Sequence, residues 1–428
     1  MKKIIFKTAM LAMFAGIMAC DTELDTVPGY VNGNVSGSAT TSAGAYMSKT
    51  SATVVFPKET EGGETIIEPR LTDIAAADTK ITLSVEDYLT AFNQNNNTEY
   101  QMLPLEGFEM YEEANPANKM RNGKLTVTVK KGNFSSKVRV KVNPLLETKY
   151  PISNRYAIPV RIASTSAARV LSDGKDALVT FSRPFKTSVL ELPRGRSFVL
   201  KLSDEIKESS EFTIQAQFMF HDQWTEYEPK TINMTLMNMG YYSRVYPHAI
   251  QIKDGSSDGD DTHAKYDMKL DTWYQVTFTF KDNDFKVYLN GELIKVFRRA
   301  NLRIRPGYGI SILNPQNSYS TRTHIREFRL WDRVLSDAEI KDKLYLPVNP
   351  ESEGLVAYLP MDKKNVFKDI SKYKNEVSLN IGIGPNSGNQ DHPRDRYVKD
   401  NVEIEEFTHS WTDNVKFPSK DNKLEIEP

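Results

Sequence analysis

The sequence predicts an all-β protein, in which an N-terminal Ig-like β-sandwich domain precedes a second, larger β-sandwich. Short segments with alternating apolar and polar residues recur from Val54 onward, and turn-forming residues separate them. Tyr and Phe, which favour strands, occur 20 times each. The 428 residues suffice for two or three domains with separate cores.

The overall charge disfavours one class of partner. The chain has 55 basic and 56 acidic residues, which gives a formal net charge of -1. A near-neutral protein creates no long-range field that attracts polyanions. We therefore do not expect nucleic acid as a partner.

Residues 1–19 have the features of an export signal. Lys2, Lys3 and Lys7 form a basic region, and the apolar run Ala9–Ala19 that follows is too short to span a bilayer as a helix. Cleavage after this run is expected.

Cys20 is the single cysteine of the chain, and it stands directly after Ile17-Met18-Ala19. This run resembles a bacterial lipobox, although Met18 is atypical. The resemblance implies that Cys20 is lipidated and anchors the mature protein to a membrane. The alternative is an incidental cysteine beside an ordinary cleavage site, but a lone thiol in an exported chain has no intramolecular disulfide partner.

Three acidic residues follow the cysteine: Asp21, Glu23 and Asp25. They resemble the export signal of surface lipoproteins in Gram-negative glycan-utilisation systems. The resemblance implies an outer-membrane location that faces the cell exterior. If the acidic residues are only part of the tether, the inner leaflet is the alternative.

Residues 20–50 are rich in Gly, Ser, Thr and Ala, as in a flexible stalk, and residues 51–185 form the predicted first sandwich. Its strand-like segments are ATVVFP, TKITLSV, KLTVTVKKG, KVRVKV and YAIPVRI. Tyr100–Pro104, Lys131-Gly132 and Tyr156–Ile162 resemble the signatures of domain of unknown function 1735. That domain occurs in Sus-type surface lipoproteins, ahead of endoglycosidases or laminin-G-like modules.

Ser182–Arg196 contains two prolines and a glycine and is predicted to connect the domains, so that residues 186–428 form the second domain. SFVLKL and FTIQAQFMF open that domain as strands. In Tyr274–Phe280, apolar and polar residues alternate, which predicts a strand buried on one face only. Asn290-Gly291 predicts a type I′ hairpin turn. Ser336 and Glu339 form a capping box, so a short helix is expected to begin at Ser336.

This order of elements resembles the laminin-G-like and pentraxin-like jelly rolls of the concanavalin A-like fold. The matching residues are Trp273, Val287–Ile294, Arg326–Trp331, Leu335–Ile340, Gly354–Asp362 and Asp369–Asn375. Two positions depart from the pattern: Leu359 replaces a usual Trp, and Tyr373 stands where Gly is common. The resemblance implies the fold, and it does not carry over the family's ligand-binding residues.

The C-terminal region adds loop and strands. Gly382–Asp400 is dominated by Gly, Pro, Asn and Asp, which predicts a loop, whereas VEIEEF and HSWTDNVKF are assigned to the same sandwich as closing strands. Hydrolases of this fold carry E-x-D-x-x-E on one strand, and the nearest match is Glu403-Ile-Glu405-Glu406. Because its spacing is wrong for two opposed acids, we predict no catalytic residues.

The acidic loop Asp254, Asp258 and Asp260 could supply oxygen ligands to calcium, the one cofactor considered. A plain hairpin tip explains the same Gly-Ser-Asp composition and is the favoured interpretation. The six histidines show no H-x-x-x-H or H-E-x-x-H spacing, so a zinc site is not predicted.

Two loops combine rings with polar side chains: His221–Tyr227 and Gly240–Tyr246. A sugar offers a flat apolar face and a rim of hydroxyls, so this mixture suits carbohydrate. The predicted ligand platform consists of Trp224, Tyr227, Tyr241, Tyr242 and Arg244. For each ring alone, packing against the core is the common alternative.

Together, these observations predict a non-catalytic surface lipoprotein that captures complex carbohydrate, with N-glycan as one candidate. Its resemblance to Sus-type lipoproteins implies transporter and glycosidase components as partners. Two alternatives remain: a diverged endoglycosidase, and a scaffold or adhesin that binds protein.

Overall fold

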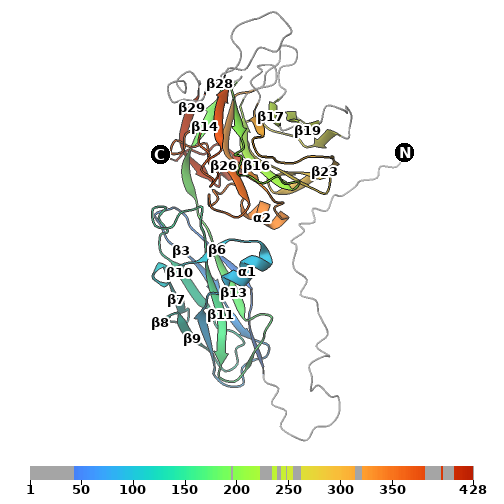
Figure 1. Ribbon diagram of the computed structural model, residues 1–428. Helices are drawn as coiled ribbons and strands as arrows, with labels where there is room; N and C mark the ends of the chain where they lie inside the picture. Colours follow the sequence, from blue (N-terminus) through green and yellow to red (C-terminus); the bar gives the residue numbers. More distant parts are fainter. Residues whose placement is uncertain are drawn as a thin grey trace, which may run out of the picture. The chain divides into compact units, whose positions relative to one another are not determined.

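The structure is a computed structural model of the 428-residue chain. It describes residues 43–193, 196–221, 234–238, 242–246, 248–253, 262–313, 321–380, 397–398 and 409–427. Residues 43–428 form one compact unit, which contains two β-sandwiches (Figure 1). The predicted signal peptide and Cys20 lie outside the described residues. Among the described helices, none has the length and apolar character needed to span a membrane.

The first sandwich consists of two larger sheets and one small sheet. One has the order β2 (Ser51–Val55), β13 (Asp176–Ser182), β11 (Arg155–Thr165), β5 (Thr79–Val85) and β9 (Lys124–Val129), and β6 (Tyr100–Met102) pairs with β11. Another has the order β3 (Gly63–Ile67), β10 (Val138–Val142), β7 (Phe108–Glu112) and β8 (Asn115–Lys119). The small sheet has the order β12 (Arg169–Val170), β1 (Gly44–Met47) and β4 (Pro69–Leu71). A helix, α1 (Leu89–Asn96), and a 3-10 turn, η2 (Leu105–Gly107), complete it.

Alternation explains the strands of this sandwich. In β9, Leu125, Val127 and Val129 enter the core, and the residues between them are more exposed. The five predicted strand segments are therefore confirmed. The stalk prediction was too long, because β1 lies within residues 20–50 and buries Ala45 and Met47 in the core.

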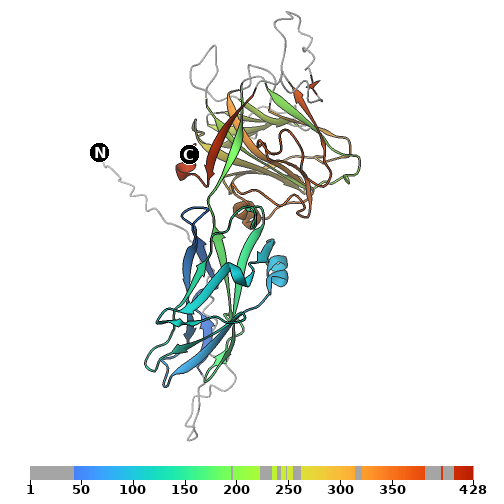
Figure 2. The same cartoon turned by 90° about the vertical axis from the view of Figure 1, so that its left-hand side faces the viewer.

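The second sandwich pairs two eight-stranded sheets (Figure 2). The β16 sheet has the order β23 (Glu292–Arg298), β22 (Asp284–Leu289), β21 (Trp273–Lys281), β16 (Phe212–Phe220), β25 (Thr323–Trp331), β14 (Phe185–Leu192) and β29 (Ser410–Phe417), with β26 (Leu355–Leu359) beside β25. The β18 sheet has the order β20 (His263–Lys265), β19 (Ala249–Lys253), β18 (Tyr242–Tyr246), β17 (Met234–Asn238), β24 (Gly309–Ile312), β15 (Ser197–Lys201), β27 (Glu376–Asn380) and β28 (Tyr397–Val398). Among the described residues, the second sandwich also contains α2 (Asp337–Asp342) and the 3-10 turn η6 (Lys420–Asn422).

The predicted connection Ser182–Arg196 was wrong over most of its length. Phe185–Leu192 forms β14, which pairs with β25 and with β29 in the β16 sheet. Val189, Leu190 and Leu192 are buried. Only Arg183 and Pro184 therefore separate β13 of the first sandwich from β14 of the second.

The prediction of a half-buried strand at Tyr274–Phe280 was also wrong. Tyr274 and Phe278 face the core, as expected, but the polar residues between them are buried as well. Gln275 is 1% exposed, because the segment after α2 covers that face of the sheet and the Tyr345 amide donates to Gln275 Oε1 at 3.0 Å. Buried amide and hydroxyl groups persist when they have such partners.

The hairpin and the helix start are confirmed. Asn290 and Gly291 have φ values of 49° and 80°, as a type I′ turn requires. At α2, the Ser336 side chain accepts from the Glu339 amide, and the Glu339 side chain accepts from the Ser336 amide. HSWTDNVKF is confirmed as β29, whereas VEIEEF lies outside the described residues.

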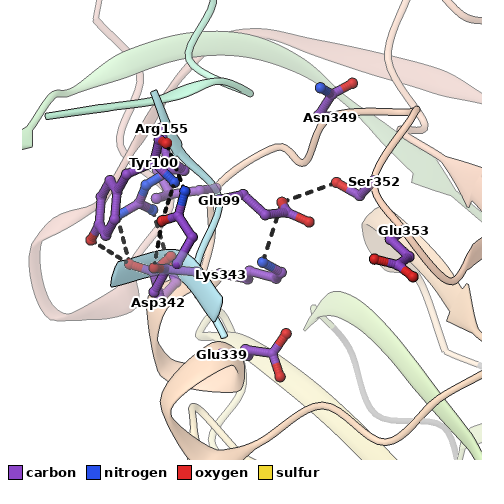
Figure 3. Close-up of polar contacts among 12 residues, drawn as sticks. Glu99, Tyr100, Arg155, Glu339, Asp342, Lys343, Asn349, Ser352 and Glu353 are labelled. Carbon is purple, nitrogen blue, oxygen red and sulfur yellow. Dashed lines mark hydrogen bonds and ion pairs between the residues drawn. The ribbon is translucent and has the colours of Figure 1, made fainter. Parts of the chain in front are cut away.

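Polar contacts join the two sandwiches at the C-terminal end of α2 (Figure 3). Arg155 of β11 donates to both the side chain and the carbonyl of Asp342. Glu99 accepts from Ser352 Oγ at 3.0 Å and lies 3.6 Å from Lys343 Nζ. Arg155 begins β11 and Glu99 directly precedes β6, both in the first sandwich. Asp342 ends α2, and Lys343 and Ser352 follow it in the second sandwich.

Candidate functional site

The outer face of the β18 sheet carries a row of polar side chains. Alternation directs Val245, Ile250 and Ala264 into the core, so the residues between them project from the opposite face. The strand register places Arg244 opposite Gln251, and Gln251 opposite His263. Three neighbouring strands thus each contribute one polar residue to a single row, which we call the Arg244–His263 row.

Gln251 is the centre of this row. Its Oε1 accepts from Arg244 Nη2 at 3.0 Å and from the Tyr246 hydroxyl at 3.2 Å. Its Nε2 donates to Thr262 Oγ1 at 3.5 Å, and the residue is only 4% exposed. A buried amide with partners on both sides holds a fixed orientation, so Gln251 positions the two side chains that bond to it.

Arg244 and Tyr246 form a stacked pair above Gln251. The guanidinium carbon lies 4.4 Å from the centre of the Tyr246 ring, which is cation–π geometry. The ring of His263 lies 5.9 Å from that of Tyr246 at an interplanar angle of 37°. Arg244, Tyr246 and His263 are all partly exposed. The row therefore presents a guanidinium, a ring and an imidazole side by side, and a ligand with hydroxyl groups and a flat apolar face can contact all three.

The predicted platform is described only in part. Arg244 belongs to the row, and Tyr242 lies on β18 with its backbone opposite Lys253. Trp224, Tyr227 and Tyr241 lie outside the described residues. The same holds for the predicted calcium ligands Asp254, Asp258 and Asp260 and for the acidic run Glu403, Glu405 and Glu406.

Sequence reasoning missed Gln251 and His263 as parts of this site. The alternation in YSRVY and AIQIK indicates that Arg244, Tyr246 and Gln251 project from one face of a strand pair. What a single sequence lacks is the register that aligns β18, β19 and β20.

A second polar cluster lies beneath the segment that covers the β16 sheet. Glu327 is 3% exposed and accepts from Arg326, from Arg329 and from the Tyr358 hydroxyl, the last at 2.8 Å. Burial, followed by the neighbouring Glu327 carboxylate, raises the pKa of Tyr358 well above its ordinary value. Burial likewise lowers the pKa of Arg326, and the nearby Glu327 opposes this shift. Because both oxygens of Glu327 have partners, loss of one partner would leave a buried charge without compensation.

No described set of three or more His, Cys, Asp or Glu side chains has an arrangement suited to a metal ion. One cleft has a volume of about 390 Å³ and is lined by Arg183, Glu147, Phe185 and Lys364, among others. Its polar groups belong to both sandwiches, and the Arg183 guanidinium already donates to the Tyr150 carbonyl at 2.8 Å.

Two family models match separate parts of the chain. The model of an N-terminal domain family matches residues 38–169, which include most of the first sandwich. The model of the concanavalin A-like lectin/glucanases superfamily matches residues 195–341, which include the Arg244–His263 row. The second sandwich is a concanavalin A-like domain. Its two packed eight-stranded sheets agree with the laminin-G-like fold that the sequence resembles.

Solved structures resemble the chain as well. A proposed carbohydrate-binding protein from Bacteroides ovatus is 18% identical with a TM-score of 0.48, over 78% of this chain and 97% of that one. A pentraxin from Limulus polyphemus is 11% identical with a TM-score of 0.29, over 37% and 82%. EndoBT-3987 from Bacteroides thetaiotaomicron, solved with a Man5GlcNAc product, is 19% identical with a TM-score of 0.26, over 32% and 30%. No curated protein matches the chain.

Proposed function

We propose that this chain is a non-catalytic protein that binds complex carbohydrate through the outer face of its concanavalin A-like domain. The observation that carries the proposal is the Arg244–His263 row, in which Gln251 orients Arg244 and Tyr246 on an outward sheet face. A positioned guanidinium donates to sugar oxygens, and a neighbouring ring contacts the C–H face of a sugar. The match to a superfamily that contains lectins and glucanases supports this choice of ligand.

The proposal also includes the aromatic platform and the lipid anchor that the sequence predicts. We include the rings of Trp224, Tyr227, Tyr241 and Tyr242 in the binding platform: Tyr242 begins β18, Tyr241 directly precedes it in the sequence, and Trp224 and Tyr227 stand in the sequence between β16 and β17. The lipobox-like run before Cys20 supports a lipid anchor in the outer membrane, displayed outward. In that location the protein would retain glycan, with N-glycan as a candidate, for Sus-type transporter and glycosidase components.

A glycan array tests the binding site directly. A soluble form that begins at Asp21 is expected to retain a subset of complex glycans, and Arg244→Ala is expected to weaken that retention about tenfold or more. The matched control is Arg298→Ala, which removes a 78% exposed arginine side chain from β23 in the other sheet. Equal retention by the wild type and Arg244→Ala would reject the row as the binding site.

Two further experiments test the lipid anchor and the dependence of binding on calcium. Cys20→Ala in the full chain is expected to move the protein from the membrane fraction to the soluble fraction of cells. The array is also repeated with a chelator, and we expect unchanged retention, because the hairpin-tip interpretation of Asp254, Asp258 and Asp260 needs no calcium. A loss of retention that added calcium restores would instead support a calcium site in that loop.

A further inference from the structure

Two histidines contact each other at one end of the β16 sheet. His221 directly follows β16, and His324 is the second residue of β25. Their side chains are only 6% and 2% exposed. His221 Nε2 and His324 Nδ1 are within hydrogen-bond distance, and the rings meet edge to face with centroids 4.5 Å apart. The proposed glycan site does not use either residue.

Each of the two histidines has a further partner at its other ring nitrogen. His221 Nδ1 lies 2.8 Å from Asp271 Oδ1, in the turn before β21. His324 Nε2 lies 2.7 Å from Thr412 Oγ1 on β29. A chain of three hydrogen bonds thus runs from Asp271 to Thr412 and connects β16, β25 and the C-terminal strand.

Strand β29 depends on this connection more than an inner strand would. It is the last strand of the β16 sheet beyond β14, and its other side makes only a short backbone contact in the part of the chain that the structure describes, with residues 425–427 through Asn414 and Lys416. The register between these strands shifts at Thr187 and Val189, which oppose Val415 and Thr412. Regular ladder bonds lapse at such a bulge, so the side-chain bond from Thr412 to His324 supports the strand where its backbone pairing is weakest.

With both histidines neutral, the three hydrogen bonds from Asp271 to Thr412 have one consistent set of donors and acceptors. The Asp271 carboxylate can only accept, so His221 Nδ1 carries a hydrogen, and in a neutral ring His221 Nε2 then accepts. His324 Nδ1 must donate to it, His324 Nε2 accepts, and the Thr412 hydroxyl donates. One added proton is also compatible with these hydrogen bonds. His221 then donates from both ring nitrogens, His324 Nδ1 accepts, and His324 Nε2–H points toward Thr412 and Glu191. A second added proton places two N–H groups face to face with no acceptor between them.

The charged groups around the pair set its response to acid. Asp271 faces His221, and Glu191 Oε2 of β14 lies 3.5 Å from His324 Nε2. Arg322 binds Glu191 Oε1 at 2.6 Å and so offsets part of that carboxylate's charge. Lys423 approaches from the C-terminal segment and donates to Thr272, the neighbour of Asp271. Asp271 can balance an imidazolium at His221, whereas Glu191 is already paired with Arg322 and balances one at His324 less well.

We propose that the His221–His324 contact is an acid-sensitive latch, which fastens β29 to the β16 sheet and opens when both rings are protonated. Opening separates the two N–H groups, rotates His324 away from Thr412 and frees the edge strand. Burial and then the neighbouring His221 lower the pKa of His324 to about 4, so the second proton binds only in acid.

Hydrogen exchange of the full-length chain tests the latch. Mass spectrometry follows the amides of Ser410–Phe417 at pH 6 and at pH 4, corrected for intrinsic exchange rates, with β5 and β11 of the first sandwich as internal reference. Protection of β29 is expected to fall at least about tenfold at pH 4 relative to that reference. Protection that falls equally in β29, β5 and β11, or in none of them, would overturn the proposal.

Variants separate the latch from general acid unfolding. His221→Gln places an amide oxygen near His324 and cannot bind a second proton, so β29 protection is expected to change less than about threefold between the two pH values. His248→Gln is the matched control, because His248 Nδ1 lies 2.8 Å from Asp267 with an 84% exposed side chain, and it should behave as the wild type. Thr412→Val should lower β29 protection at both pH values. The same acid response in His221→Gln as in the wild type would reject the latch.

Discussion

Arg155 Nη2 of the first sandwich donates to Asp342 Oδ1 of α2 at 2.6 Å, and Arg155 Nη1 donates to the Asp342 carbonyl at 2.9 Å (Figure 3). The Tyr100 hydroxyl adds a bond to the same carboxylate at 3.3 Å. Only about a fifth of either charged side chain is exposed, at 19% for Arg155 and 21% for Asp342. This ion pair is thus shielded from solvent and contacts both sandwiches.

Breaking this pair is expected to lower the free energy of unfolding. Arg155→Ala or Asp342→Asn each should cost about 1–3 kcal/mol, between the values typical of exposed and of buried pairs. A double-mutant cycle measured by urea unfolding should give a coupling of about 1 kcal/mol. Lys130→Ala, which removes the exposed pair with Asp78, is the control and should leave the free energy of unfolding nearly unchanged. Additive effects of the two substitutions would show that the contact contributes nothing.

The buried histidine pair predicts how stability depends on pH. The pKa of His324 is lowered to about 4 by burial and by His221, whereas an unfolded histidine binds its proton near pH 6.5. Between these values the unfolded chain holds more protons, so stability is complete above pH 6.5 and falls as the pH decreases toward 4. The loss attributable to this site should approach about 3 kcal/mol.

Urea unfolding at intervals from pH 4 to pH 7.5 measures this dependence. His324→Gln is expected to flatten the curve over that range, whereas His248→Gln should leave it unchanged because His248 is exposed. A curve that is equally steep in the wild type and in His324→Gln would contradict the assignment.

Tyr358 is expected to stabilise the fold through one hydrogen bond. Its hydroxyl donates to Glu327 Oε2 at 2.8 Å, in a cluster where Tyr358 and Glu327 are 2% and 3% exposed. Tyr358→Phe removes this donor from a buried carboxylate and should cost about 1–3 kcal/mol in urea unfolding. Tyr266→Phe, at a 38% exposed position, should cost less than about 0.5 kcal/mol. Equal small effects at the two positions would mean that Arg326 and Arg329 satisfy Glu327 without Tyr358.

A side chain at Gly291, in the hairpin turn after β22, is expected to destabilise the fold by steric contact as well as by backbone strain. Gly291 has φ +80°, and a Cβ there would lie 3.1 Å from Lys341 Cγ of α2. Gly132 has φ +86° with nothing within 4 Å of its Cβ position. Gly132→Ala should therefore cost about 1 kcal/mol through backbone strain alone, and Gly291→Ala should cost more, because the Lys341 side chain on α2 must also shift. Thermal unfolding of the two variants compares them, and a smaller effect at Gly291 would contradict the close approach of α2.

Many elements of the fold were predicted correctly from residues that are close together in the sequence. Period-two alternation located β9, β16 and β21, and the pairs Asn290-Gly291 and Ser336/Glu339 located a turn and a helix start, because each depends on residues close in sequence. The burial of Gln275 could not be foretold in this way. It depends on where the segment after α2 docks, and Tyr345 is far from Gln275 in sequence.

The same distinction applies to the candidate site. Arg244 was predicted because it stands among tyrosines in Gly240–Tyr246, but that segment was interpreted as a loop, whereas Tyr242–Tyr246 forms β18. Gln251 and His263 join it only through the register of β18, β19 and β20, which a single sequence does not give. His221 and His324 are similar, since they are distant in sequence and no histidine spacing motif links them.

One measurement tests the central claim most directly. The purified soluble form is incubated with a panel of N-glycans and other complex oligosaccharides, bound glycan is recovered, and its mass is compared with the input. We predict that at least one glycan is retained by the wild type, is retained much less by Arg244→Ala, and is recovered intact. Recovery of shortened glycan, or retention of no glycan at all, would contradict the account.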